Sequence, residues 1–293
     1  MPFFNSDDRH GGALLGRAVN LRSLLVGVAL VALTFTGGLR VAAASGPNAG
    51  GPQGAAGAGP RLALVIGNGD YRDLPKLIGA VSDADLMAET LTARGFKVVK
   101  ATNVRRAVMV ALLADFEQTL ASQGGVGVFY FSGQAAHAAG EEIMFPVEAR
   151  ATGSLSLLKE EGISLSQVQR DLPARTARPW RDNGIVTIYA TSKGQVAFDS
   201  LPGQKNSPFA IAFVNAVKQP GDVPEVFQRV RQSVEEAFRD PRAQGFKQTP
   251  DISGQLREGF FFNQAARDPV GSVSRILLLD TSRDTVSSGG LTR

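Results

Sequence analysis

Residues 62–66 read Leu-Ala-Leu-Val-Ile, a continuous apolar run that decides the fold class. A run without polar alternation is typical of a strand buried on both faces of a parallel sheet. A helical pattern follows, in which Ala84, Met87, Ala88 and Leu91 form one apolar stripe at helical spacing. A buried strand followed by an amphipathic helix is the repeating unit of α/β proteins.

The same alternation continues along the chain. Further strands are expected at 96–99, 126–131 and 185–190, where short apolar runs recur. Helices are expected to start after Asn103, at Asn206-Ser207-Pro208 and at Val223, and a further helix is expected over 162–172. Extended segments are expected over 141–147 and 259–262, the last as an edge strand. The sequence therefore predicts an α/β fold: a three-layer α/β/α sandwich with a mostly parallel central sheet.

The amino-acid composition excludes several classes of protein and of functional site. The 293 residues are 43% hydrophobic and 20% charged, which fits one globular domain with appendages. The net charge is +4, but the basic residues are scattered, so nucleic acid is not an expected partner. The chain has no cysteine, which excludes disulfides, thiolate metal sites and a thiol nucleophile. No cofactor is expected.

The N-terminal part has the features of an export signal. Arg17 and Arg22 precede the apolar stretch 24–35, and small residues lead to a cleavage position after Ala44. The alternative is an uncleaved anchor formed by residues 23–39, which is near the shortest length that spans a bilayer. In both cases we expect the folded part to be exported, to the periplasm or the exterior, with contact to a membrane only through an uncleaved leader.

The remaining boundaries follow from composition. Residues 45–60 are rich in Gly, Ala and Pro and predict a flexible linker. The domain is expected over 61–263. Residues 264–293, which contain one apolar patch at 276–279, are interpreted as a poorly ordered tail.

Four stretches taken together, at 61–99, 126–147, 185–209 and 226–231, resemble the caspase-like peptidases, and especially their bacterial metacaspase branch. The resemblance covers residues 61–263. It implies a caspase-like fold and a family of cysteine-type endopeptidases, which carry out proteolysis with a Cys nucleophile and a His base.

The position of the family's His is occupied by another residue. In the family the His follows a strand, in the pattern Tyr/Phe-Ser/Ala-Gly-His-Gly, and the match here is Tyr130-Phe131-Ser132-Gly133-Gln134. A carboxamide cannot accept a proton near neutral pH, so Gln134 cannot act as the base.

No motif like the family's nucleophile motif exists in this chain. The resemblance places it at the end of the next strand, in a motif like Leu-Asp-Ala-Cys-Arg, but residues 172–185 pass through Trp180 without such a segment. We therefore expect one core strand of the sheet to be missing. Trp180 is interpreted either as a cleft aromatic or as a patch over the gap.

The favoured function is a catalytically inactive pseudo-peptidase that acts as a binding or regulatory module. Its partner is expected to be a peptide segment of another exported protein. The resemblance implies that any surviving substrate groove is lined by Gln134, Tyr189, Thr191, Ser192 and Gln195.

Two alternatives stay open. One is a hydrolase with a rebuilt site, in which Ser132 or Ser192 would need to lie within hydrogen-bond reach of His137. His137 stands among alanines, however, and is interpreted as a histidine of a surface loop. The other alternative is a degenerate homologue that does not fold stably.

Three aspartates could in principle bind a metal ion, but their positions do not predict a metal site. Asp83, Asp85 and Asp199 carry suitable oxygen ligands, yet two carboxylates at the start of a helix more often complement the helix dipole. No metal is expected.

Overall fold

The structure is a computed structural model that describes residues 59–138, 140–150, 155–171, 181–240, 243, 245–263, 268 and 271–281. The expected leader (1–44), almost all of the expected linker and Trp180 lie outside these residues. None of the described helices is long and apolar enough to cross a membrane.

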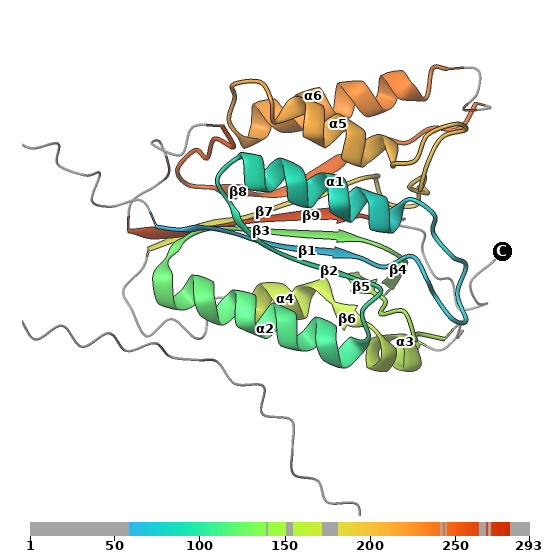
Figure 1. Cartoon of the computed structure of the whole chain (residues 1–293), viewed down its shortest axis with the longest axis horizontal. Helices are drawn as coiled ribbons and strands as arrows, with labels where there is room; N and C mark the ends of the chain where they lie inside the picture. Colours follow the sequence, from blue (N-terminus) through green and yellow to red (C-terminus); the bar gives the residue numbers. More distant parts are fainter. Residues whose placement is uncertain are drawn as a thin grey trace, which may run out of the picture. The chain divides into compact units, whose positions relative to one another are not determined.

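The core is a six-stranded sheet with the order β2-β1-β3-β9-β7-β8 (Figure 1). The first five of these strands are parallel, and β8 is antiparallel to β7 at the edge. Their bounds are β1 Arg61–Gly67, β2 Lys97–Thr102, β3 Gly125–Ser132, β7 Arg181–Tyr189, β8 Asp251–Leu256 and β9 Ser272–Asp280.

Helices cover both faces of this sheet (Figure 1). Successive side chains of a strand point to opposite faces, so Ala63 and Val65 pack under one helical layer while Leu64 and Ile66 pack under the other. The first layer consists of α1 Ala80–Ala93, α5 Pro208–Ala216 and α6 Val223–Ala237, and the second consists of α2 Arg106–Gln123 and α4 Leu165–Asp171. The predicted three-layer α/β/α architecture is confirmed.

A small second sheet follows β3. It has the order β4-β5-β6, and its strands are antiparallel. The bounds are β4 Ala135–Ala138, β5 Glu141–Met144 and β6 Ile163–Ser164, and α3 Leu155–Glu161 lies between β5 and β6 in the chain.

Two local predictions were wrong. Asn103 is not the N-cap of α2, which is Arg105; it has a φ of 51°. The Oδ1 of Asn103 instead accepts hydrogen bonds from the backbone N–H groups of Gly69 and Asp70, at 2.9 Å each. An edge strand was expected over 259–262, but the strand at the edge of the sheet next to β7 is β8. Phe260 and Phe262 are buried because their rings pack into the core around Phe96.

The largest correction concerns the C-terminal part. Residues 272–280, which were assigned to a poorly ordered tail, form β9 in the middle of the sheet. All nine residues of β9 are buried, and it is hydrogen-bonded to β3 on one side and β7 on the other. The sheet therefore does not lack the strand that was expected to be missing, because a segment from further along the chain fills that place.

A buried ion pair connects Asp268, which precedes β9 in the chain, to Arg61 at the start of β1. The Arg61 guanidinium donates two hydrogen bonds to the Asp268 carboxylate, each of 2.6 Å, and both side chains are almost fully buried. The same guanidinium also donates to the carbonyl oxygens of Arg94, Phe261 and Phe262. Because its donors are satisfied on several sides, this pair meets the condition under which a buried charge is tolerated.

We predict that a chain ending at Gly271 does not fold cooperatively. It loses five buried apolar side chains of β9, which together contribute about 10 kcal/mol at about 2 kcal/mol each, and this is as large as the whole stability of a typical domain. Thermal unfolding followed by circular dichroism tests this. A chain ending at Thr281 keeps β9 and is the matched control, with an expected unfolding midpoint close to that of the full chain. A cooperative transition in the shorter chain would contradict the central role of β9.

A candidate binding pocket at the ends of β3 and β9

Gln134 lies two residues beyond the end of β3 and is held in place by Tyr71. The backbone N–H of Gln134 donates to the Tyr71 hydroxyl at 2.7 Å, and that hydroxyl donates to the Phe145 carbonyl at 3.0 Å. Gly133 is needed here, since a Cβ at this position would lie 2.6 Å from the Tyr71 hydroxyl. The Gln134 side chain donates from Nε2 to the carbonyl of Pro75 at 3.0 Å.

Beside Gln134 lies a small acidic pocket of about 30 Å³. This is space for about one water molecule. Three carboxylates face it, from Asp83 of α1, Asp199 of the loop after β7, and Asp280 at the end of β9. The other residues that line it are Leu77, Ser132, Gly133, Gln134, Ala197, Phe198, Ser207 and Thr281.

Ser207 connects two of these carboxylates. Its backbone N–H donates to Asp83 Oδ1 at 3.0 Å, and its hydroxyl donates to Asp280 Oδ2 at 2.5 Å. The same hydroxyl oxygen accepts from the N–H of Ala210 and so forms the N-cap of α5. Tyr130 also donates its hydroxyl to Asp280, at 3.0 Å.

One carboxylate oxygen has no partner. Asp83 is fully buried, and its Oδ1 also accepts from the side-chain amide of Asn206 at 2.8 Å, whereas Oδ2 is buried without a hydrogen-bond partner. A buried acceptor without a partner is costly. The pocket therefore contains an unsatisfied negative group at its wall.

Burial and mutual repulsion both act against ionisation here. Burial raises the pKa of Asp83 to about 6, with a smaller contribution from the nearby charge of Asp199, and the hydrogen bonds from Asn206 and Ser207 only partly oppose this. Burial and the charge of Asp83 likewise raise the pKa of Asp280 well above its usual range. The pocket favours either a proton or another positive charge.

Asp83 contacts the start of a helix other than its own, and Asp199 accepts the hydrogen bonds at the start of α1 instead. Asp83 stands in the first turn of α1, but its carboxylate contacts the start of α5. The start of α1 is served by Asp199, whose Oδ2 accepts from the backbone N–H groups of Ile78 and Gly79 at 2.6 and 2.8 Å. Asp85 is exposed and pairs with Lys100 at 2.5 Å. In the part of the chain that the structure describes, no cluster of acidic and His side chains could hold a metal ion.

Comparison with known proteins identifies the family. Residues 60–261, more than half of the chain, match the model of the Caspase domain. The chain belongs to the caspase-domain family. Among solved structures, the crystal structure of caspase-1 from Spodoptera frugiperda is similar, with a TM-score of 0.54 and 15% identity. That match covers 70% of this chain and 91% of the other, and no curated protein matches.

The caspase-domain match ends at residue 261, before β9. Sequence reasoning missed β9 and, with it, Asp280 as a pocket residue. A signal was present, because Ile276–Leu279 is a continuous apolar run of the same kind as residues 62–66. The Ser and Gly residues at the end of the chain favour a poorly ordered tail instead, and they outweigh this single run when the sequence is read alone.

The other groove residues that the caspase resemblance suggests lie away from this pocket. Thr191 is buried, and its hydroxyl donates to Gln195 Oε1 at 3.1 Å. The same Oε1 accepts from the backbone N–H of Thr249, whose carbonyl in turn accepts from the Ser192 hydroxyl at 3.0 Å. These three side chains connect the loop after β7 to the backbone of Thr249. Tyr189 lines a different cavity, which His137 shares.

His137 does not stand in a surface loop as expected. It lies on β4, its side chain is 13% exposed, and its Nδ1 is 3.3 Å from Glu142 Oε2. Its cavity, of about 260 Å³, is lined by neither Ser132 nor Ser192. Ser132 lines the acidic pocket instead. The geometry thus gives no support to a rebuilt Ser–His site with these serines.

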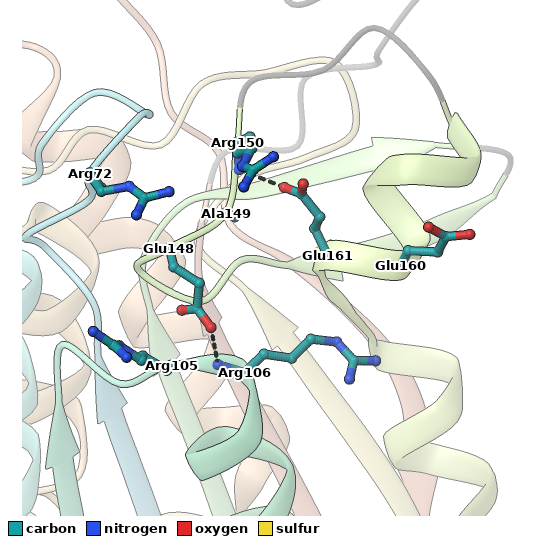
Figure 2. Close-up of a pocket in the computed structure, with 8 residues that line it drawn as sticks. All are labelled: Arg72, Arg105, Arg106, Glu148, Ala149, Arg150, Glu160 and Glu161. Carbon is teal, nitrogen blue, oxygen red and sulfur yellow. Dashed lines mark hydrogen bonds between the residues drawn. The ribbon is translucent and has the colours of Figure 1, made fainter. Parts of the chain in front are cut away.

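A larger cavity, of about 530 Å³, lies at the start of α2 (Figure 2). Its charges nearly balance, since four arginines and three glutamates line it. Two of the carboxylates already accept backbone hydrogen bonds, Glu148 from Arg106 at 2.9 Å and Glu161 from Arg150 at 2.5 Å. It shares no residue with the acidic pocket. We place the candidate site at the acidic pocket, because three carboxylates and, among the described residues, no basic side chain line it and burial raises the pKa of two of these carboxylates.

We predict that the Asp83→Asn variant changes how stability depends on pH. Folding raises the pKa of Asp83 from 3.8 to about 6, so the folded state favours the protonated acid. The contribution of Asp83 to stability is fully present below about pH 4 and is lost as the pH rises through 6. The free energy of unfolding of the wild type minus that of the variant should therefore fall by roughly 2 kcal/mol between pH 4 and pH 7.

Urea unfolding across this pH range provides the measurement. Glu89→Gln, an exposed change on the same helix, is the control and should show a difference that does not vary with pH. A difference for Asp83→Asn that is equally flat would show that this carboxyl is not destabilised by burial.

Proposed function

We propose that this domain is a non-catalytic member of the caspase family that binds a peptide segment of a partner through a basic side chain at the acidic pocket. One observation carries the proposal: Asp83, whose Oδ2 is buried without a hydrogen-bond partner, lines the same small pocket as the carboxylates of Asp199 and Asp280. A lysine ammonium or an arginine guanidinium would supply the missing donor and the missing positive charge.

The non-catalytic part of the proposal rests on the chemistry of the family's reaction. The family's reaction proceeds through attack of a thiolate on a carbonyl, and this chain has no thiol. Gln134, which the resemblance assigns to the position of the base, has a side chain that does not take up a proton near neutral pH. A domain of this kind retains the fold that presents a peptide but not the groups that cut it.

The size of the pocket limits how a ligand enters. Its volume of about 30 Å³ accepts only the tip of a side chain. Ala197, Phe198 and Asp199, on one side of it, belong to the segment between β7 and α5, in which residues 190–207 contain no helix or strand. Segments without regular structure open more readily than packed strands. The proposed ligand therefore inserts a basic tip while this loop moves outward.

The partner that we propose is a segment of another exported protein. This rests on the export signal expected in residues 1–44, after which the domain would meet its partner in the periplasm or outside the cell.

We predict that a short acetylated peptide amide with one arginine binds the protein, and that the same peptide with citrulline binds at least tenfold more weakly. Citrulline keeps the shape of arginine but removes the charge that the carboxylates attract. Isothermal titration calorimetry at pH 7.5 gives both affinities. A tenfold loss corresponds to about 1.4 kcal/mol, a reasonable value for one partly buried charged hydrogen bond.

Two variants locate the binding. Asp280→Asn should weaken binding of the arginine peptide at least tenfold, whereas Asp85→Asn, which removes an exposed charge on α1, should leave it unchanged. Equal effects of the two variants, or equal binding of both peptides, would mean that net charge rather than the pocket governs the interaction.

We also predict that the purified domain does not cleave peptides after Arg, Lys or Asp under the reducing conditions used for thiol proteases. Mass spectrometry of the incubated peptides provides the test. A fluorophosphonate probe should likewise leave the protein unlabelled, and labelling that disappears in His137→Ala would support the serine hydrolase alternative instead.

A further inference from the structure

The cavity at the start of α2, which the proposed function does not use, brings together four arginines from three separate segments of chain (Figure 2). Arg72 belongs to the loop after β1, Arg105 and Arg106 stand at the start of α2, and Arg150 follows β5. The volume of about 530 Å³ lies within the range of cavities that bind small molecules.

Backbone hydrogen bonds hold these three segments together. The N–H of Arg72 donates to the carbonyl of Val147 at 3.0 Å, and the N–H of Val147 donates to the carbonyl of Val104 at 3.2 Å. Glu148 accepts from the N–H of Arg106 at 2.9 Å, which connects the segment after β5 to the start of α2. The backbone positions from which the arginines extend are therefore fixed, and this lowers the ordering cost when a ligand binds.

The guanidinium groups on this cavity are largely without carboxylate partners. Among the residues that the structure describes, neither Arg105 nor Arg150 takes part in an ion pair. Arg72 pairs only with Asp73, its neighbour in the chain, at 3.0 Å, and both side chains are exposed. Because an exposed pair of this kind contributes little, all three guanidinium groups are available to a ligand.

The start of α2 adds positive charge at the same place. Its N-cap residue is Arg105, whose side chain makes no capping hydrogen bond, and no acidic residue stands in the first turn. The start of a helix carries about half a positive charge, which makes a basic residue there unfavourable. An arginine at the N-cap position departs from the local preference, and departures of this kind are expected at functional sites.

The carboxylates of the cavity do not cancel this charge. Four arginines and three glutamates leave a formal charge of +1, to which the start of α2 adds about half a charge. Figure 2 shows Arg72 and Arg105 on one side of Glu148 and the two glutamates of α3 on the other. A phosphate monoester carries about −1.5 to −2 charges at neutral pH and three acceptor oxygens, so its charge matches this excess.

We propose that this cavity binds a small molecule that carries a phosphate monoester group, with Arg72, Arg105 and Arg150 donating to the phosphate oxygens. Guanidinium groups bind phosphate through paired N–H donors, and three of them on different segments surround one phosphate better than one residue could. The site is separate from the acidic pocket, with which it shares no residue.

Isothermal titration calorimetry of the full-length protein with glycerol 3-phosphate, at low ionic strength and pH 7.5, provides the test. We expect saturable binding of glycerol 3-phosphate and no binding of glycerol. Succinate should bind more weakly, because it divides its charge between two carboxylates. The R105Q/R150Q variant should bind glycerol 3-phosphate at least tenfold more weakly, since it loses two of the three proposed donors.

K247Q/R257Q is the matched control. Lys247 and Arg257 are exposed and do not line the cavity, so this variant removes two positive charges elsewhere on the surface. We expect its affinity for glycerol 3-phosphate to be unchanged. Thermal unfolding of both variants ensures that only folded protein is compared. The proposal would be overturned by a lack of saturable binding, by equal weakening in the two variants, or by succinate binding as tightly as glycerol 3-phosphate.

This inference is independent of the proposed peptide binding, and the two can fail separately. The titration with glycerol 3-phosphate contains no peptide, and the arginine peptide carries no phosphate. Binding of glycerol 3-phosphate together with no binding of the arginine peptide would retain this site and reject the proposed function.

Discussion

The insertion of β9 between β3 and β7 is the interaction on which the rest of the structure depends. Without it, the sheet divides into a part formed by β1, β2 and β3 and a part formed by β7 and β8. Each part would expose one open edge and lose the apolar residues that β9 packs against both helical layers. The buried pair of Arg61 and Asp268 fixes the direction from which this strand enters.

The acidic pocket depends on the same insertion. Its three carboxylates come from α1, from the loop after β7 and from the end of β9, and Ser207 holds two of them while it caps α5. Hydrogen bonds to a shared serine allow Asp83 and Asp280 to remain close despite their repulsion. Asp83 Oδ2 remains an acceptor without a hydrogen-bond partner, and a positively charged donor would offset the cost of burying it.

The protein therefore combines the fold of the caspase-domain family with the absence of any cysteine, which is consistent with loss of the family's cysteine protease activity. Catalysis in this family needs sulfur and a titratable ring, and both depend on single side chains, whereas the sheet depends on many apolar contacts spread over six strands. The hydrogen bonds of Tyr71 position the backbone at Gln134, whose side-chain amide does not take up a proton near neutral pH.

The sequence by itself determined the layer architecture, because apolar runs such as 62–66 and the helical stripe around Met87 reflect local periodicity. It also determined the absence of a thiol, which is a matter of composition. It predicted the helix start at Ser207 from the serine followed by proline, but not the contact with Asp280, 73 residues away. Only the tertiary structure decided that β9 lies in the centre of the sheet and that the Asp83 carboxylate accepts a hydrogen bond from Ser207 at the start of α5. Strand order and long-range hydrogen bonds depend on which distant segments bury one another's surface, and no local pattern encodes that choice.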